Sequence, residues 1–387
     1  MISRDLREVF EDPSALAAPR RRAPTDLIIA TLEIVATGYT VLVFALLLTV
    51  QIAPQSADIP NRQPQLGADG TRVALTYGAG DSVFFAESKD AGKSWSKPVV
   101  VSSQGKLSLG MRRGPRIAMT PEAIVISAVV GEKGLGADGD LIAWRSVDGG
   151  RAWSAGKTIN DVSSAAREGL HTMAAGGKGM LFAAWLDLRG KGTRLCGSIS
   201  PDGGATWSPN ALVYESPSGS VCECCHPTAA INAQGRIFVL FRNSIDGNRD
   251  MYLTRSDDVG KTFGPAAKLG AGTWKLNACP MDGGALQVGA DGKPLSIWRR
   301  EREVFLSAGT NVEQRIGAGR HPILVTTPRG PAMAWTEGKQ LKVVAPGRKD
   351  AITIESDAAY PSMVALPSGA VLLAWEQGGA IVVRRLD

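Results

Sequence analysis

The chain has 387 residues and a formal net charge of +6, and 44% of its residues are apolar and 21% charged. With 45 glycines and 22 prolines, this composition indicates a globular protein rich in turns and excludes a disordered, collagen-like or polytopic membrane protein. The modest charge and the lack of long Lys/Arg runs argue against a nucleic-acid binder, whereas a small anionic ligand or an anionic surface would suit it. Five cysteines are too few for a disulfide scaffold. We therefore expect many short strands, in an all-β repeat protein.

The first part of the chain differs from the rest. Residues 34–53 are twenty consecutive uncharged and mostly apolar positions, and a helix of that length spans a bilayer core of about 30 Å. Arginines at 20–22 precede this run, whereas Asp58 follows it, so the positive-inside rule places the N-terminus in the cytoplasm. The alternative is a signal peptide that is cleaved near Ala57.

Either interpretation exports most of the chain. The predicted organisation is a cytoplasmic tail at 1–25, a transmembrane anchor at 26–55 and an extracytoplasmic domain at 56–387. The protein is expected in the inner (cytoplasmic) membrane, with this domain on the periplasmic or extracellular side, where cysteines can oxidise. The predicted partners are the membrane, through one helix, and a small anionic ligand or a metal ion.

One short pattern, Ser-x-Asp-x-Gly-x-x-Trp, occurs four times, and its last copy ends in Phe263 instead of Trp. The copies are 58, 54 and 56 residues apart and begin at Ser88, Ser146, Ser200 and Ser256. In such a turn, a short Ser or Asp side chain binds the backbone N–H groups, and glycine adopts positive φ without strain. The pattern resembles the Asp-box repeat of the sialidase superfamily, in which the box joins the third and fourth strands of a propeller blade. The resemblance implies a structural role, on the rim opposite the active site, for Asp90, Asp148, Asp202 and Asp258.

A second repeating element consists of a proline turn, an apolar strand, a glycine turn and a strand that often ends in Trp. It occurs seven times, at Gln63-Pro64, Gly114-Pro115, Leu170-His171, His226-Pro227, Cys279-Pro280, His321-Pro322 and Tyr360-Pro361. Units of roughly 47 residues suit four-stranded blades. A β-propeller of seven blades is therefore predicted, with six as the alternative because sialidases have six. The last unit has room for only three strands, and we expect the stretch after the anchor to supply the fourth and close the ring.

The histidines and several cysteines share one position in these units. The innermost strands of a propeller begin together at one mouth of the central channel, so residues beside the strand-opening prolines meet in space. All three histidines and four cysteines lie at or next to that position: His171, His226, His321, Cys222, Cys224, Cys225 and Cys279. Thiolates and imidazoles are ligands for Cu or Zn, so these residues are predicted to form a metal site.

The cysteines also allow other interpretations. The spacing Cys222-x-x-Cys225-His226 satisfies the pattern for attachment of a c-type haem, although a bulky macrocycle at a propeller mouth would be unusual. One or two disulfides that fix a loop in an oxidising compartment are a third interpretation. Cys196 lies in a predicted strand away from the mouth and is expected to be a small buried apolar residue.

Two segments near the mouth resemble active-site segments of sialidases. The sequence Asn-Arg-Gln-Pro-Gln-Leu at 61–66 looks like the family's Phe-Arg-Ile-Pro-x-Leu, and Ala-Tyr-Pro-Ser-Met at 359–363 looks like the segment that carries its tyrosine nucleophile. The resemblance implies that Tyr360 is the nucleophile and that three arginines bind the substrate carboxylate, namely Arg62, Arg242 and Arg320. His226 stands where the family has its glutamate base, and Asp81 is the candidate for the acid/base residue.

The leading functional prediction is that the mouth of a membrane-anchored propeller binds a ligand, a soft metal ion. The alternatives are an exo-α-sialidase-type glycoside hydrolase that uses Tyr360, and a disulfide-stabilised platform for protein interactions. Three further basic residues, Arg112, Arg116 and Arg299, are predicted to lie in solvated edges and hairpins.

Overall fold

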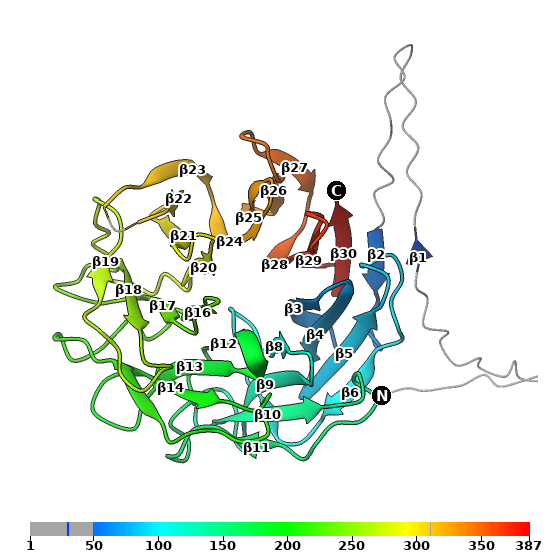
Figure 1. The fold of residues 1–387 in the computed structure, drawn as a ribbon, viewed down its shortest axis with the longest axis horizontal. Coiled ribbons are helices and arrows are strands. Elements are labelled where there is room, and N and C mark those ends of the chain that lie inside the picture. Colours follow the sequence, from blue (N-terminus) through cyan, green and yellow to red (C-terminus); the bar gives the residue numbers. More distant parts are fainter. Residues whose placement is uncertain (1–28, 31–48, 310) are drawn as a thin grey trace, which may run out of the picture.

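The computed structural model describes residues 29–30, 49–309 and 311–387, which form seven antiparallel sheets arranged in a ring (Figure 1). The predicted all-β propeller of seven blades is thus confirmed, and the six-bladed alternative is wrong. The first strand of each blade faces the central channel, and the later strands follow outward. Neighbouring blades contact one another mainly through these first strands and the strands beside them.

The first four blades follow one another directly along the chain. Blade 1 contains β3 (Asn61–Asp69), β4 (Arg72–Ala79), β5 (Ser82–Ser88) and β6 (Val99–Ser102). Blade 2 contains β8 (Arg116–Met119), β9 (Ile124–Gly131), β10 (Asp140–Ser146) and β11 (Lys157–Thr158), with the short β7 (Lys106–Leu107) also paired to β9. Blade 3 contains β12 (His171–Ala175), β13 (Leu181–Asp187), β14 (Arg194–Ser200) and β15 (Ala211–Tyr214), with a short 3₁₀ helix at Gly177–Gly179. Blade 4 contains β16 (Thr228–Ile231), β17 (Ile237–Arg242), β18 (Met251–Ser256) and β19 (Ala267–Lys268).

The last three blades complete the ring. Blade 5 contains β20 (Ala285–Val288), β21 (Pro294–Arg300), β22 (Glu303–Ser307) and β23 (Gln314–Ala318). Blade 6 contains β24 (Arg320–Thr327), β25 (Gly330–Glu337), β26 (Gln340–Val344) and β27 (Ile352–Glu355). Blade 7 contains β28 (Ala359–Ala365), β29 (Val371–Gln377), β30 (Ala380–Leu386) and β2 (Thr49–Ile52), and β1 (Ile29–Ala30) pairs with β2.

The second strand of each blade forms much of the core. Neighbouring blades cover both of its faces, which explains why these strands are nearly continuous apolar runs instead of alternating ones. Four tryptophans near the ends of such strands are buried, at most 2% exposed: Trp185, Trp298, Trp335 and Trp375. A large apolar ring at this repeated position fills the space between blades.

The ring closes through an N-terminal strand. In blade 7, β2 runs antiparallel to β30, with Val50 opposite Val383 and Ile52 opposite Ile381. Both β2 residues are buried, 2% and 5% exposed. This strand pairs the edge that β30 would otherwise leave open.

The closing strand corrects one prediction. Residues 49–52 belong to the apolar run that the sequence predicts as a membrane helix, but they form a strand because the unpaired edge of β30 satisfies their backbone groups. The propeller therefore includes residues from Thr49 onward, not from residue 56. Residues 26–28 and 31–48 of the predicted anchor, and the predicted tail at 1–25, lie outside the described residues. Within the described ranges, no helix is long and apolar enough to cross a membrane.

The four Asp boxes are the turns between the third and fourth strands. In each, the serine hydroxyl donates to the aspartate and accepts from the glycine N–H, as at Ser256, whose Oγ lies 2.7 Å from Asp258 Oδ1 and 2.8 Å from the N–H of Gly260. These turns lie on the rim opposite the ends at which the first strands begin. Hydrogen bonds from Thr262 lower the pKa of Asp258 to about 2.

Candidate metal and ligand sites at the channel mouth

The start of the first strands forms the channel mouth, where buried charged and titratable side chains meet. The ring of His321 lies 4.8 Å from the ring of Tyr360, and the guanidinium of Arg112 lies 5.8 Å from the same tyrosine ring. Arg112 also donates from Nε to His321 Nδ1 at 3.4 Å, so this imidazole nitrogen acts as an acceptor. Burial lowers the pKa of His321 to about 4, which keeps its ring neutral at neutral pH.

Three side chains at the mouth stand on strained backbone. Gln63, His321 and Tyr360 have φ of 56°, 55° and 48°, a region that non-glycine residues rarely adopt. Each precedes a proline and lies at a break in the pairing of the first strand of its blade. Residues before proline favour extended backbone instead. Strain of this kind persists only where surrounding contacts impose it, and it is common at functional sites.

Two carboxylates hold this strained backbone in place. Glu376 Oε1 accepts from the backbone N–H of Gln63 at 2.7 Å, and Asp282 Oδ2 accepts from the backbone N–H of His321 at 2.8 Å. Burial raises the pKa of Glu376. Burial alone would also raise the pKa of Asp282, but His321 and the nearby guanidiniums lower it overall, so this carboxylate is ionised.

A cluster of sulfur atoms lies beside the mouth, in the loop that connects blades 3 and 4 and contacts Arg242 at the end of β17. Cys222 Sγ lies 2.8 Å from Cys225 Sγ and 3.8 Å from Cys224 Sγ, and all three sulfur atoms fall within 4.8 Å of one another. The three residues are buried, 0%, 1% and 8% exposed for Cys222, Cys225 and Cys224. We call these three residues the cysteine triad. Among the described residues, it is the one place where His, Cys, Asp or Glu ligand atoms gather at metal-binding spacing.

Positive charge and further sulfur atoms surround the cysteine triad. Cys279 is exposed and contacts Cys224, which raises the pKa of Cys279 to about 11, and Met281 packs against the triad. Hydrogen bonds from Cys224 and Cys225 lower the pKa of Cys222, with Arg242 contributing. Thiolates are the form of cysteine that binds metal ions, and neighbouring guanidiniums favour that form.

The three histidines predicted as metal ligands are not part of the triad. His171 is fully buried, and its Nε2 lies 3.0 Å from the hydroxyl of Ser127. His226 follows the triad directly, but its Nε2 hydrogen-bonds to the carbonyl of Gly284 at 3.1 Å and it faces the channel. His321 contacts Arg112 and Tyr360, as described above.

The c-type haem interpretation fits poorly. Cys222 and Cys225 face each other in a buried space that Met281 and their own loop fill, whereas a haem requires room for a macrocycle beside both sulfur atoms. Cys196 is 3% exposed and pairs with Trp185 across β13 and β14, as expected for a small apolar residue of the core.

The arginines predicted to clamp a carboxylate have other partners. Arg62 is about half exposed and forms an ion pair with Glu376 at 3.2 Å. Arg242 is 1% exposed, donates to the carbonyls of Asp282, Arg249 and Arg299, and covers the ring of Trp274 at 5.2 Å. Arg320 is exposed at the start of β24. Asp81 lies on the turn between β4 and β5 and pairs with Lys106 at 2.8 Å.

The predicted solvation of three other arginines is wrong. Arg112, Arg116 and Arg299 are 5%, 8% and 8% exposed. Arg299 lies over Trp274 at 5.0 Å, on the same ring that Arg242 covers. Asp282 is a site residue that the sequence did not predict. It lies two residues after the strand-opening Pro280, and that position could have identified it.

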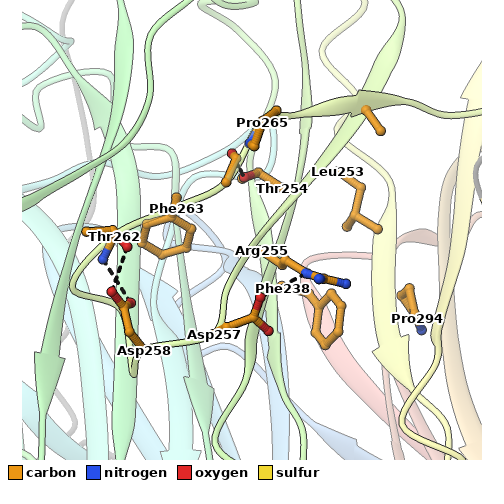
Figure 2. A pocket seen from close by; sticks show the side chains of 12 residues that line it. Phe238, Leu253, Thr254, Arg255, Asp257, Asp258, Thr262, Phe263, Pro265 and Pro294 are labelled. Carbon is orange, nitrogen blue, oxygen red and sulfur yellow. Dashed lines mark hydrogen bonds and ion pairs between the residues drawn. The ribbon is translucent and has the colours of Figure 1, made fainter.

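A second cavity lies away from the mouth. It has a volume of about 720 Å³ and is lined by Asp-box residues of blade 4, together with Phe238, Leu253 and Pro294 (Figure 2). Its polar side chains already have partners, since Thr262 donates to Asp258 and Arg255 pairs with Asp257. Because these polar groups pair with one another on the exposed rim, the buried groups at the mouth are the better candidate site.

The fold and the mouth define the class of this protein as a seven-bladed β-propeller with a buried thiol cluster beside its channel. The chain belongs to the BNR repeat-like domain family, whose pattern matches residues 78–373. This match confirms the resemblance to sialidase-type propellers that the Asp boxes predict. None of the curated proteins that were compared with the chain matches it.

Several solved structures are similar. An α-L-arabinanase from Penicillium chrysogenum has 15% identity and a TM-score of 0.51, over 88% of this chain and 97% of its own. A virginiamycin B lyase from Staphylococcus aureus has 10% identity and a TM-score of 0.53, over 88% of this chain and 100% of its own. The NanB sialidase from Streptococcus pneumoniae has 13% identity and a TM-score of 0.49, over 84% of this chain and 68% of its own. At these identities the first two show the shared fold alone.

Proposed function

We propose that this propeller binds a soft metal ion, Cu(I) or Zn(II), through Cys222, Cys224 and Cys225. The observation that carries the proposal is the convergence of three buried sulfur atoms within 4.8 Å of one another, at the edge of the channel mouth. Soft thiolate ligands select these metals among those common in proteins. Cys279 is the candidate for a fourth, exposed ligand, which would let an ion enter or leave.

Positive charge lies near the sulfur atoms, as a bound thiolate requires. Hydrogen bonds from Cys224 and Cys225, with Arg242 contributing, lower the pKa of Cys222, whereas burial raises the pKa of Cys225 and the contact with Cys224 raises that of Cys279, so a metal ion must displace the protons of those two thiols. Disulfides are neutral and need no compensating charge, whereas buried thiolates do. In an oxidised protein the contacts would suit two disulfides, Cys222–Cys225 and Cys224–Cys279, so the two interpretations need a direct test.

The test is metal binding by the full chain, reduced and handled without oxygen. Titration with Cu(I) or Zn(II) against a chromophoric competitor is expected to show one tightly bound ion per chain. Cys222→Ser and Cys225→Ser are expected to lose this binding, because each removes one of three ligands. Cys196→Ser is the matched control, since it removes the cysteine that lies outside the cluster, and it is expected to bind the ion like the wild type.

Thiol counting separates the metal from the disulfide interpretation. The protein is isolated without reductant, denatured with chelator and alkylated. All five cysteines are expected to react if the thiols hold a metal. A metal-free protein in which only Cys196 reacts would contradict the proposal and support two disulfides.

A sialidase-type hydrolase is the second candidate function. It is favoured by Tyr360, which stands on strained backbone at the mouth beside His321 and Arg112, and by the fold shared with a protein named as an arabinanase. Release of a fluorophore from a sialoside or an arabinoside, abolished in Tyr360→Phe, would support it. Absence of turnover with either across acid to neutral pH would contradict it.

For the location, we propose an extracytoplasmic propeller held at the inner membrane by the chain that precedes β2. The support is the apolar run that leads into the closing strand, with arginines at 20–22 before it; a single crossing requires that β1 (Ile29–Ala30) separate from β2, because paired strands keep both ends of this segment on the propeller's side. The full chain is expected in the membrane fraction after an alkaline wash, with the propeller accessible to protease from outside. Release into the soluble fraction would support a cleaved signal peptide instead.

A further inference from the structure

The central channel contains a small cavity near its mouth. Its volume is about 210 Å³, and residues at or beside the first strands of all seven blades line it. Its charged lining consists of Arg112 and Arg116, and no Asp or Glu borders it. The remaining polar lining is neutral: Gln65, Thr172, His226, Thr228, Gln287 and Ser362.

The two arginines carry buried charge that the protein offsets only in part: Asp282 and Glu376 act on Arg112, and neither of the described carboxylates forms an ion pair with Arg116. Arg116 donates only to the carbonyls of Arg112, Gly114 and Pro115. Burial, followed by repulsion from Arg112, lowers the pKa of Arg116 to about 9. Arg112 likewise donates to the carbonyls of His321 and Pro361. A buried charge without a partner is costly, so a counter-ion in the channel would stabilise both guanidiniums.

The nearby carboxylates are already engaged. Glu376 pairs with Arg62 and holds the backbone of Gln63. Asp282 holds the backbone of His321 and faces Arg242 as well as Arg112. Neither residue borders the cavity, so neither offers a hydrogen-bond acceptor to the cavity space, although both act on Arg112 from behind.

Hydrogen-bond donors other than the arginines also remain available in the cavity. Thr172 and Ser362 are 7% and 6% exposed, and each hydroxyl accepts a backbone N–H, from Ala229 at 3.2 Å and from Leu66 at 3.0 Å. No acceptor for either hydroxyl proton is found among the described residues. Arg112 and Arg116 each direct three of five possible N–H donors, at most, to protein acceptors. The cavity is thus lined by unused donors.

We propose that the channel binds a small tetrahedral oxyanion, phosphate or a phosphate ester, through Arg112, Arg116, Thr172 and Ser362. The donors come from blades 2, 3 and 7, which surround the cavity, and such an arrangement suits an ion with oxygens on all sides better than a planar carboxylate. A volume of about 210 Å³ corresponds to roughly seven water molecules, enough for such a group but not for an oligosaccharide. This site is independent of the cysteine triad.

The test is binding of inorganic phosphate to the full chain, by calorimetry and by thermal unfolding at constant ionic strength. Phosphate is expected to bind saturably and to raise the unfolding temperature, and Arg116→Gln is expected to weaken binding about tenfold or more. Arg255→Gln, an exposed arginine on the other rim, is the control and is expected to bind like the wild type.

A milder variant covers the case in which Arg116→Gln does not fold. Ser362→Ala removes one hydroxyl and is expected to weaken phosphate binding by a smaller factor. Binding of glucose 6-phosphate, with glucose as the control, shows whether the site accepts a phosphate ester. If only inorganic phosphate binds, the site accepts the free ion alone. Failure of the wild type to bind either phosphate compound, or unchanged binding in both variants, would overturn the proposal and leave the metal proposal unaffected.

Discussion

The rim that carries the Asp boxes and the rim around the channel mouth are built from the same seven repeating units, yet they place charge in opposite ways. On the Asp-box rim, charged side chains are exposed and bind turns of their own blade, as Asp258 does. At the mouth, several charged side chains are buried and hold backbone of neighbouring blades, as Asp282 and Arg242 do, although Arg62 and Arg320 are exposed there.

Arginines join blades on the Asp-box rim as well, as Arg145 does by donating to the carbonyl of Gly203 in the next blade. The difference therefore lies in burial: the mouth holds charge away from solvent, where it can bind a ligand, and the Asp-box rim does not.

The largest difference between the rims is expected from the loss of one arginine on each. Arg242→Ala leaves three buried carbonyls without a donor and uncovers Trp274, so the free energy of unfolding is expected to fall by about 3 kcal/mol or more. Arg255→Ala, on the Asp-box rim, removes an exposed ion pair with Asp257 and is expected to cost about 1 kcal/mol or less. Denaturant unfolding measures both, and equal losses would remove the distinction between the rims.

A smaller effect is expected from pH at the mouth. Burial, followed by Arg116, lowers the pKa of His171 to about 3 in the folded protein, whereas the unfolded chain has a value near 6.5. Between these values the unfolded state binds more protons, so stability falls as pH falls, by at most about 1.4 kcal/mol per pH unit from this residue. His171→Gln is expected to flatten this dependence. If the free energy of unfolding has the same slope between pH 6.5 and 4.5 in His171→Gln and in the wild type, burial does not lower the pKa of this imidazole.

The smallest effect is expected on the Asp-box rim, where hydrogen bonds to a charged group, and not burial of a neutral one, shift the pKa. Hydrogen bonds lower the pKa of Asp258 from 3.8 to about 2, so its ionised form stabilises the fold above the unfolded value and this contribution is lost as pH falls towards about 2. Asp258→Asn is expected to lower the unfolding temperature slightly at neutral pH. The difference from the wild type is expected to vanish in acid, and a difference that persists there would argue against a role for the charge.

Much of the fold could be predicted from local patterns. The four Asp boxes and the strand-opening prolines mark turns whose chemistry is local, and they predict seven blades. The closing strand was assigned to the N-terminal side but not to residues 49–52, because a short apolar run has the same appearance in a strand and in a helix. What decides between them is the open edge of β30, which lies more than three hundred residues away in sequence.

The candidate site could be predicted only in part. Adjacent cysteines in one loop converge because the loop is short, so the triad follows from sequence. The burial of Arg112 and Arg116 could not be predicted in this way, because it depends on how the first strands of all seven blades surround the channel. Arg242 matched a substrate-binding position by its place at the end of a strand, but its guanidinium points to carbonyls that neighbouring loops supply.

The most direct test of the account is X-ray absorption spectroscopy of the full chain after loading with one equivalent of Zn(II) or Cu(I). The account predicts a shell of at least three sulfur scatterers, at about 2.3 Å for zinc, that disappears in Cys225→Ser and persists in Cys196→Ser. A shell of only oxygen or nitrogen near about 2.0 Å, or sulfur ligation that survives in Cys225→Ser, would contradict it.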